Sequence, residues 1–103
     1  MMKIEWTRSA SRDVRSMKNL VRLDSESYAE RLVQKIVGAA EHAAAFPHAG
    51  RKVPEADAQD IREVLYRNYR IIYRIERDRI LVLMVIHGAR DLTLITPKPW
   101  EIE

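Results

Sequence analysis

The chain has 103 residues, of which 47% are hydrophobic and 32% charged, and its net charge is +3. Its length favours one folded domain, residues 1–103, and its composition is too apolar for a disordered protein and too rich in charge for a membrane protein. The absence of cysteine excludes disulfides, thiolate catalysis and sulfur-ligated metals, and with three scattered histidines we expect neither a metal nor a cofactor.

Charge is segregated along the chain. Residues 1–23 hold six Lys or Arg against two acids and residues 61–100 hold eight against four, whereas residues 24–60 hold four against seven. Arginine outnumbers lysine 13 to 5. Because a planar guanidinium binds phosphate and carboxylate bidentately, this bias suits a surface for nucleic acid or an acidic partner, although solvated strand faces have a similar composition.

A strand and a helix are predicted at the start of the chain. Residues 3–7 alternate, with Ile4 and Trp6 on one face, which is typical of a short strand. Thr7 or Ser9 then caps a helix whose apolar positions recur at spacings of three and four. Basic residues lie off that apolar stripe: Arg8, Arg12, Arg15, Lys18 and Arg22. We therefore expect an amphipathic helix whose basic outer face attracts an acidic partner.

A second, alanine-rich helix follows. Asp24 and Ser25 are suitable N-caps, and apolar residues recur at helical spacing until Pro47 ends the helix. Because only residues 23–25 separate the two helices, we expect an antiparallel helical hairpin. Residues 47–59 contain two prolines, a glycine and two acids, which predicts a loop.

The second half of the chain has a period of two, which is typical of strands. It predicts strands over residues 61–66, 69–76 and 79–87, joined by turns. The last strand contains the longest apolar run, which indicates a central strand buried on both faces and is far shorter than the roughly 20 residues of a membrane span. No signal region precedes the first strand, so we expect a cytoplasmic protein without membrane contact. Two prolines exclude a regular helix from the end of the tail, residues 88–103.

The predicted order is β-α-α-β-β-β, an α+β fold in which the helical hairpin packs on one face of a mainly antiparallel sheet. The other face of the sheet would then be open for function. Three arginines alternate with apolar residues on the predicted strands, and we expect them to point outward on that face: Arg62, Arg70 and Arg74. His87 and Arg90 lie where the last strand ends, and Glu55 is a loop carboxylate that can act as a general base.

A histidine beside several arginines can move protons and stabilise a phosphorane during RNA cleavage. The alternative interpretation is that the arginines and Glu55 are solvated and that His87 only caps the end of its strand. Tyr69 and Tyr73 share a stripe with isoleucines, so core packing explains them better than stacking on bases.

Segments along almost the whole chain resemble one protein family. They are Ile4-Glu5-Trp6-Thr7, Gly50-Arg51-Lys52-Val53-Pro54-Glu55, Tyr69-Arg70-Ile71-Ile72-Tyr73-Arg74 and His87-Gly88-Ala89-Arg90-Asp91-Leu92. These segments are similar to the RelE/ParE superfamily of toxins from bacterial type II toxin–antitoxin systems, also described as plasmid stabilisation proteins. The resemblance implies an α+β fold, a cognate antitoxin and a toxin–antitoxin hetero-oligomer.

The ending of residues 87–92 resembles ParE-like members more closely. This resemblance implies a protein that inhibits growth by poisoning DNA gyrase without a known catalytic site. The residues that contact the target would be Arg70, Arg74, His87 and Arg90.

Resemblance to RelE-like members implies instead an endoribonuclease that cuts mRNA on the ribosome. The scissile phosphate would contact Arg62, Arg70 and Arg90, and His87 or Glu55 would move protons. The chain departs from this pattern, because its second strand lacks a Lys-x-Lys pair and no Tyr or His follows His87. We therefore expect a ParE-like binding poison and not an enzyme, with a relic that retains only antitoxin binding as a third alternative.

Overall fold

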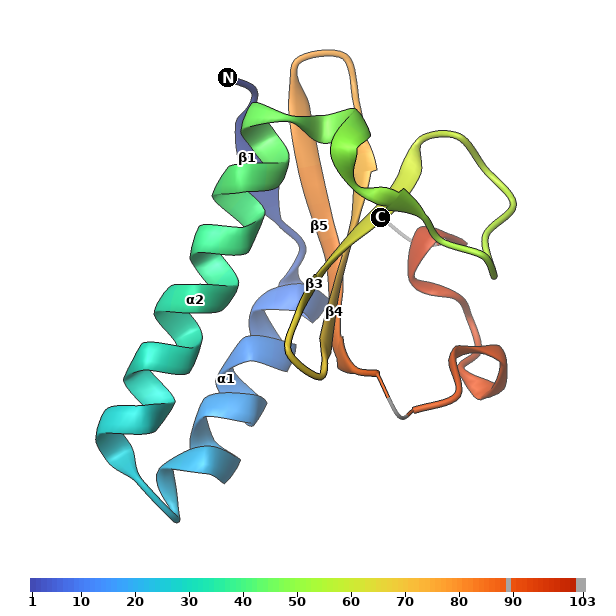
Figure 1. The fold of residues 1–103 in the computed structure, drawn as a ribbon. Helices are drawn as coiled ribbons and strands as arrows, with labels where there is room; N and C mark the ends of the chain where they lie inside the picture. Colours follow the sequence, from blue (N-terminus) through green and yellow to red (C-terminus); the bar gives the residue numbers. More distant parts are fainter. Residues whose placement is uncertain (89, 102–103) are drawn as a thin grey trace.

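The computed structural model describes residues 1–88 and 90–101 and has the element order β-α-α-β-β-β-β (Figure 1). The helices are α1 (Arg8–Arg22) and α2 (Glu26–Ala45). The strands are β1 (Lys3–Trp6), β2 (Arg51–Lys52), β3 (Ile61–Tyr66), β4 (Tyr69–Ile75) and β5 (Arg79–His87). The short 3-10 helices are η1 (Pro47–Ala49), η2 (Leu92–Leu94) and η3 (Pro99–Glu101). The helical hairpin lies against one face of the sheet, which confirms the predicted α+β fold.

The five strands form one sheet in the order β1-β5-β4-β3-β2. β1 pairs with β5 in parallel, and the other neighbours are antiparallel. β5 is an interior strand as expected, but β4 holds the central position because the sheet extends two strands beyond it. β2 was not predicted, since its two exposed residues give no alternation and it exists only by pairing with residues 62 and 63 of β3.

The helix-facing side of the sheet holds the larger apolar core. Ala10 of α1 and Leu32 and Ile36 of α2 pack with buried β4 and β5 residues, including Ile71 and Val82. Small alanines on both helices allow the backbones to approach the sheet closely. Within residues 1–88 and 90–101, no helix has the length and apolar content to cross a membrane.

Thr7 caps α1: its side-chain oxygen accepts a hydrogen bond from the N–H of Ala10 at 3.0 Å. Replacing Thr7 with Ala is expected to lower the free energy of unfolding by about 1 kcal/mol, because that N–H loses its acceptor. Ser9→Ala, within the helix, is the matched control and should change stability by less than about 0.5 kcal/mol. Urea unfolding followed by circular dichroism measures both variants, and equal losses would contradict the assignment of the cap.

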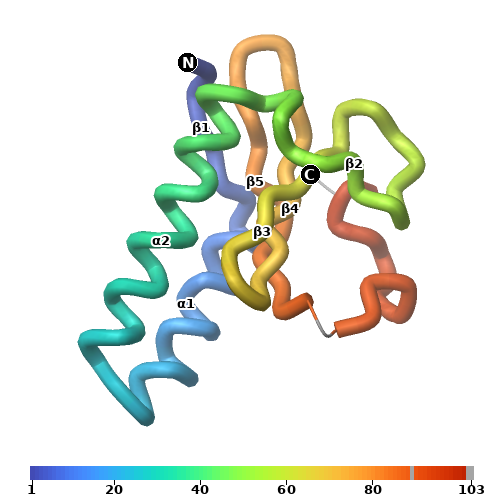
Figure 2. Tube along the Cα trace, viewed as in Figure 1, coloured from blue at the N-terminus to red at the C-terminus, as the bar shows by residue number. Residues whose placement is uncertain are grey.

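The other face of the sheet is covered, contrary to the expectation of an open face. A second core joins Ile72, Leu81 and Leu83 of the sheet to Val53 of the loop before β3 and to Leu92 of the tail. Figure 2 shows that loop and the tail curling over the side of the sheet away from the helices. Burial of β5 on both faces therefore depends on these segments, whose irregular backbone gave no periodic signal.

Candidate functional site

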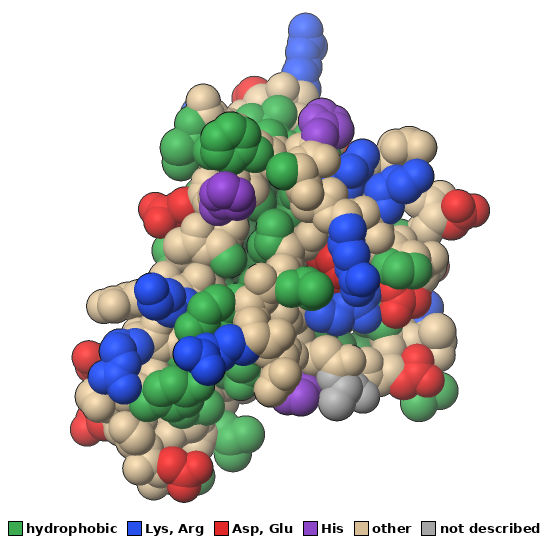
Figure 3. Space-filling model, viewed as in Figure 1, with side chains coloured by type: hydrophobic (Ala, Val, Ile, Leu, Met, Phe, Trp, Pro, Cys, Tyr) green, Lys and Arg blue, Asp and Glu red, His purple; other side chains and the backbone are tan. Residues whose placement is uncertain are grey.

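Four charged side chains form a connected network on the face of the sheet away from the helices. Glu63 of β3 is buried, and its carboxylate accepts hydrogen bonds from the Nε of Arg51 and, at 2.6 Å, from the Nε of Arg70. The two terminal nitrogens of Arg70 donate to the two carboxylate oxygens of Glu55 at 2.9 and 3.1 Å. Figure 3 shows basic and acidic side chains in contact on the side of the molecule where β2 and β3 lie.

This network links two residues proposed from the sequence, Glu55 and Arg70, but as an ion pair. Arg70 has a side chain only 10% exposed, and three of its nitrogens donate to the two carboxylates. Hydrogen bonds from Arg70 lower the pKa of Glu55, and hydrogen bonds to Glu55 raise the pKa of Arg70. Both groups are therefore held in their charged forms, which leaves Glu55 a weak general base.

The Glu55–Arg70 pair should make stability depend on pH. The pKa of Glu55 is lower in the folded state than its ordinary value of 4.5, so its stabilising effect is complete above that value and is lost as pH falls through the lowered pKa. We expect Glu55→Gln to be less stable than the unchanged chain at about pH 7 and the difference to shrink at about pH 3. Urea unfolding across this range measures it, and a difference independent of pH would rule out the ionised pair as its source.

Arg62 and Arg74 do not join this network. In the register of β3 and β4, Arg62 lies opposite Tyr73 and so points to the helix side, whereas Arg74 shares the far face with Arg70. The guanidinium of Arg62 donates to the backbone carbonyls of residues 48, 50 and 59, and Arg74 donates to Glu76 at 3.0 Å. Arg62 thus anchors the chain before β2 to β3, and the expectation that the three arginines share one outward face is wrong.

His87 lies on the helix side of the sheet, opposite Tyr69 in register, and the two rings meet edge to face at 5.6 Å. A cavity of about 410 Å³ beside α1 is lined by both rings, Asp13, Arg90 and neighbouring apolar residues. Burial raises the pKa of Asp13, while the N–H of Val85 donates to its carboxylate at 3.1 Å. The structure therefore brings His87 and Arg90 together beside Asp13, and His87 also lines a second cavity with Arg51 and Arg70 at the end of the β3–β4 hairpin.

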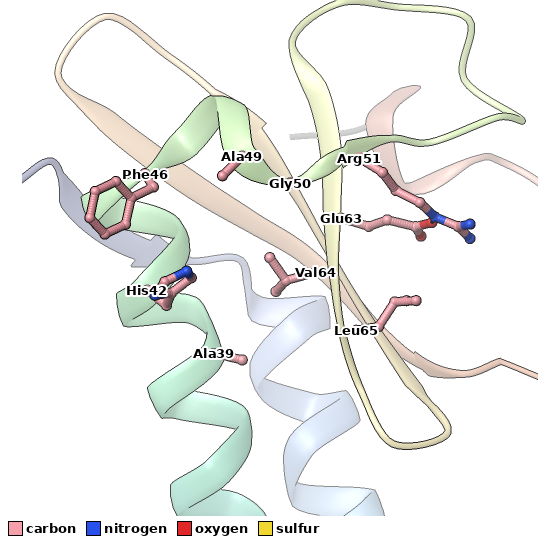
Figure 4. A pocket seen from close by; sticks show the side chains of 9 residues that line it. All are labelled: Ala39, His42, Phe46, Ala49, Gly50, Arg51, Glu63, Val64 and Leu65. Atoms are coloured by element: carbon pink, nitrogen blue, oxygen red, sulfur yellow. The ribbon is translucent and has the colours of Figure 1, made fainter.

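A further cavity of about 410 Å³ lies between α2 and β3 (Figure 4). Val64 points toward α2, and Phe46, the residue that follows α2, is 59% exposed; Leu65 points to the other side of β3 and is 55% exposed. β2 pairs only with residues 62 and 63, so no strand among the described residues borders the outer edge of β3 beyond Glu63. This cavity, the α2–β3 groove, places the exposed ring of Phe46 beside that edge of β3, whereas the side chain of Arg51 points away from α2 toward Glu63.

Sequence reasoning missed Arg51, Glu63 and Asp13 as members of these sites. Glu63 did carry a signal, because it stands between Ile61 and Leu65 on the same face of a predicted strand, where an acid requires a buried cation. Within residues 1–88 and 90–101, no three potential metal-ligating side chains converge.

Comparison with known proteins gives two findings and one absence. A family model described as the ParE toxin of type II toxin–antitoxin system, parDE, matches residues 4–92. A solved structure described as the chromosomal ParDE TA system from P. aeruginosa is similar in fold, with a TM-score of 0.70 and 24% sequence identity, over 84% of this chain and 96% of that chain. None of the curated proteins matches.

Proposed function

Because the chain belongs to the ParE toxin family of type II toxin–antitoxin systems, we propose that it inhibits growth by poisoning DNA gyrase and that a cognate antitoxin neutralises it. The observation that carries the choice of target is the pairing of Arg70 with Glu55 and Glu63. In an RNA-cleaving toxin this arginine would have to present its guanidinium to a phosphate, and here both terminal nitrogens already donate to a carboxylate.

Proton transfer by the proposed catalytic residues is also disfavoured by their positions. A base and an acid each contribute roughly 10²–10⁴-fold to such a reaction when both reach the reacting atoms. Glu55 contacts Arg70 on one face of the sheet, whereas the ring of His87 contacts Tyr69 on the other. A phosphodiester bond would have to displace Glu55 from Arg70 before either group could act on it, and this ion pair supports a binding poison over a ribonuclease.

Two exposed surfaces suit protein partners. The basic residues of α1 lie on its outer face, beside the cavity that holds His87 and Arg90, and we assign this side to the target. The α2–β3 groove offers the exposed ring of Phe46 beside an edge of β3 that no described strand borders beyond Glu63, which suits an antitoxin segment with apolar residues.

The test of this function compares two purified targets. Toxin incubated with gyrase and supercoiled plasmid should trap cleaved DNA or block supercoiling, and toxin incubated with programmed ribosomes should leave the mRNA intact. Codon-phased mRNA cuts, lost in His87→Ala, would replace this proposal with the ribonuclease alternative.

Arg90→Ala is expected to reduce growth arrest by roughly 10- to 100-fold in toxin dose, because a charged contact with the target is lost. Arg90 is exposed and outside the apolar cores, so the fold should remain intact. Arg77→Ala, an exposed arginine in the turn at the far end of β5, is the matched control and should arrest growth normally. Equal growth arrest by both variants at equal expression would remove Arg90 from the target surface.

A further inference from the structure

Side chains at the start of α1 and within it complete the edge of β5 beyond the point where β1 ends. β1 pairs with β5 only as far as Val82, whose carbonyl then accepts from the N–H of Thr7 at 3.0 Å. The hydroxyl of Thr7 donates to the carbonyl of Leu83 at 3.3 Å. Further along, the carboxylate of Asp13 accepts from the N–H of Val85 at 3.1 Å. Asp13 thus takes the place of a neighbouring strand at this end of β5.

A negative charge is more than the N–H of Val85 requires. Asp13 is half-buried, and its burial raises its pKa, which means that the surroundings disfavour the ionised carboxylate. An asparagine has the same shape and could accept from Val85 without the cost of desolvating a charge. A cation that interacts with Asp13 would explain why the acceptor at this position is an acid.

Arg90 is the cation that meets this charge from the end of β5. Asp13 and Arg90 line the same cavity beside α1, and Asp13 is the only acid among the described residues that line it. The charge of Arg90 favours the ionised form of Asp13, as does that of Arg12, the preceding residue of α1. The N–H of Arg90 donates to the carbonyl of His87 at 3.0 Å, which fixes the backbone of Arg90 in a turn directly after β5.

We propose that Asp13 is a positioning residue, whose carboxylate is anchored on β5 and holds the guanidinium of Arg90 where it contacts the target. Only the assignment of that contact to the target rests on the proposed function. Arg90 is exposed, and a free arginine side chain loses much conformational freedom when it binds. Ordering it beforehand is worth roughly three- to tenfold in affinity.

This role and simple charge attraction predict opposite signs for the loss of Asp13. Removing an acid from the basic side of α1 makes that side more attractive to an acidic partner, so attraction alone predicts stronger binding. A positioning role predicts weaker binding, although the net positive charge increases.

The test measures the concentration of purified toxin that inhibits gyrase. Asp13→Asn keeps an oxygen for the N–H of Val85 and removes the charge, and it should raise that concentration by roughly three- to tenfold. Its midpoint of urea unfolding should not fall, because a half-buried charge is lost. Asp24→Asn removes the same charge from an exposed residue in the turn between α1 and α2, and should have little effect. Combining Asp13→Asn with Arg90→Ala should cost no more than Arg90→Ala alone.

A second measurement follows the order of Arg90 without a target. NMR relaxation of its Nε–H should show less motion in the unchanged chain than that of the exposed Arg77. Asp13→Asn should make Arg90 as mobile as Arg77. The same substitution should leave Arg79 unchanged, because the Nε of Arg79 donates to Glu76.

The outcomes separate this role from the alternatives. Unchanged or stronger inhibition by Asp13→Asn, or an effect equal to that of Asp24→Asn, would overturn the proposal in favour of general charge attraction. A lower midpoint of unfolding with no change in the mobility of Arg90 would reduce Asp13 to a structural cap of β5. Equal mobility of Arg90 and Arg77 in the unchanged chain would overturn the proposal without any variant. If the unchanged toxin does not inhibit gyrase, the proposed function fails, and the relaxation data still decide whether Asp13 holds Arg90.

Discussion

Glu63→Ala is expected to lower the free energy of unfolding by about 3 to 5 kcal/mol, because it leaves Arg70 buried with only the partly exposed Glu55 as a partner. The carboxylate of Glu63 is fully buried and bridges the guanidinium groups of Arg51 and Arg70. Ions inside a protein are costly without a partner, and the loss is a large fraction of the roughly 5 to 15 kcal/mol that stabilises a typical domain.

Urea unfolding followed by circular dichroism measures this loss, with Glu5→Ala as the control. Glu5 pairs with Arg79 at 2.8 Å, but its side chain is 54% exposed, so its removal should cost less than about 1 kcal/mol. A small loss for Glu63→Ala, equal to that of the control, would mean that the network does not stabilise the fold. Conversely, a large loss would show that the buried network contributes to the stability of the fold.

The elements of the fold were predictable where the chain has a regular period. α1, α2 and the strands β3, β4 and β5 all show the helical or alternating spacing that their burial demands, and each was expected within a residue or two of its observed bounds. β2 and the segments that cover the far face of the sheet follow no period, because their conformation depends on what they pack against. The apolar run of β5 did imply a cover on both faces.

The candidate site was less predictable than the fold, because it depends on which side of a strand each residue occupies relative to distant loops. Alternation correctly placed Arg70 and Arg74 on one face of the sheet. Arg62 does not belong with them, because its neighbour Glu63 lies on the face of Arg70 and successive residues of a strand point to opposite faces. The pairing of Arg70 with Glu55 joins residues 15 positions apart through a loop, and no local pattern encodes that contact.

The placement of the two basic surfaces follows from the same covered sheet. The loop before β3 and the tail cover the far face of the sheet. The two arginines on that face, Arg70 and Arg74, are therefore mostly buried and paired with glutamates at the margin of the covered face. Exposed cations are instead found on α1 and at the end of the β3–β4 hairpin. The proposed contacts with a protein target therefore lie at the border of the sheet and not at its centre.

Leu92→Ala tests whether the tail is part of the folded core, and is expected to lower the free energy of unfolding by about 2 to 4 kcal/mol. Leu92 is 1% exposed and packs with residues such as Ile72 and Leu83 on the face of the sheet away from the helices. Truncation to alanine removes this apolar contact and leaves a cavity that the rigid sheet cannot close.

Leu94 lies two residues further along the same 3-10 helix and is 80% exposed, which makes Leu94→Ala a control of identical chemistry. Its loss should be below about 0.5 kcal/mol, because the side chain is already in water. The urea concentrations at the unfolding midpoints of the two variants distinguish the two positions when the free energy of unfolding has the same slope against urea in both variants. Equal small losses would mean that the tail does not seal the second core, and the second face of the sheet would then be open as its alternation first suggested.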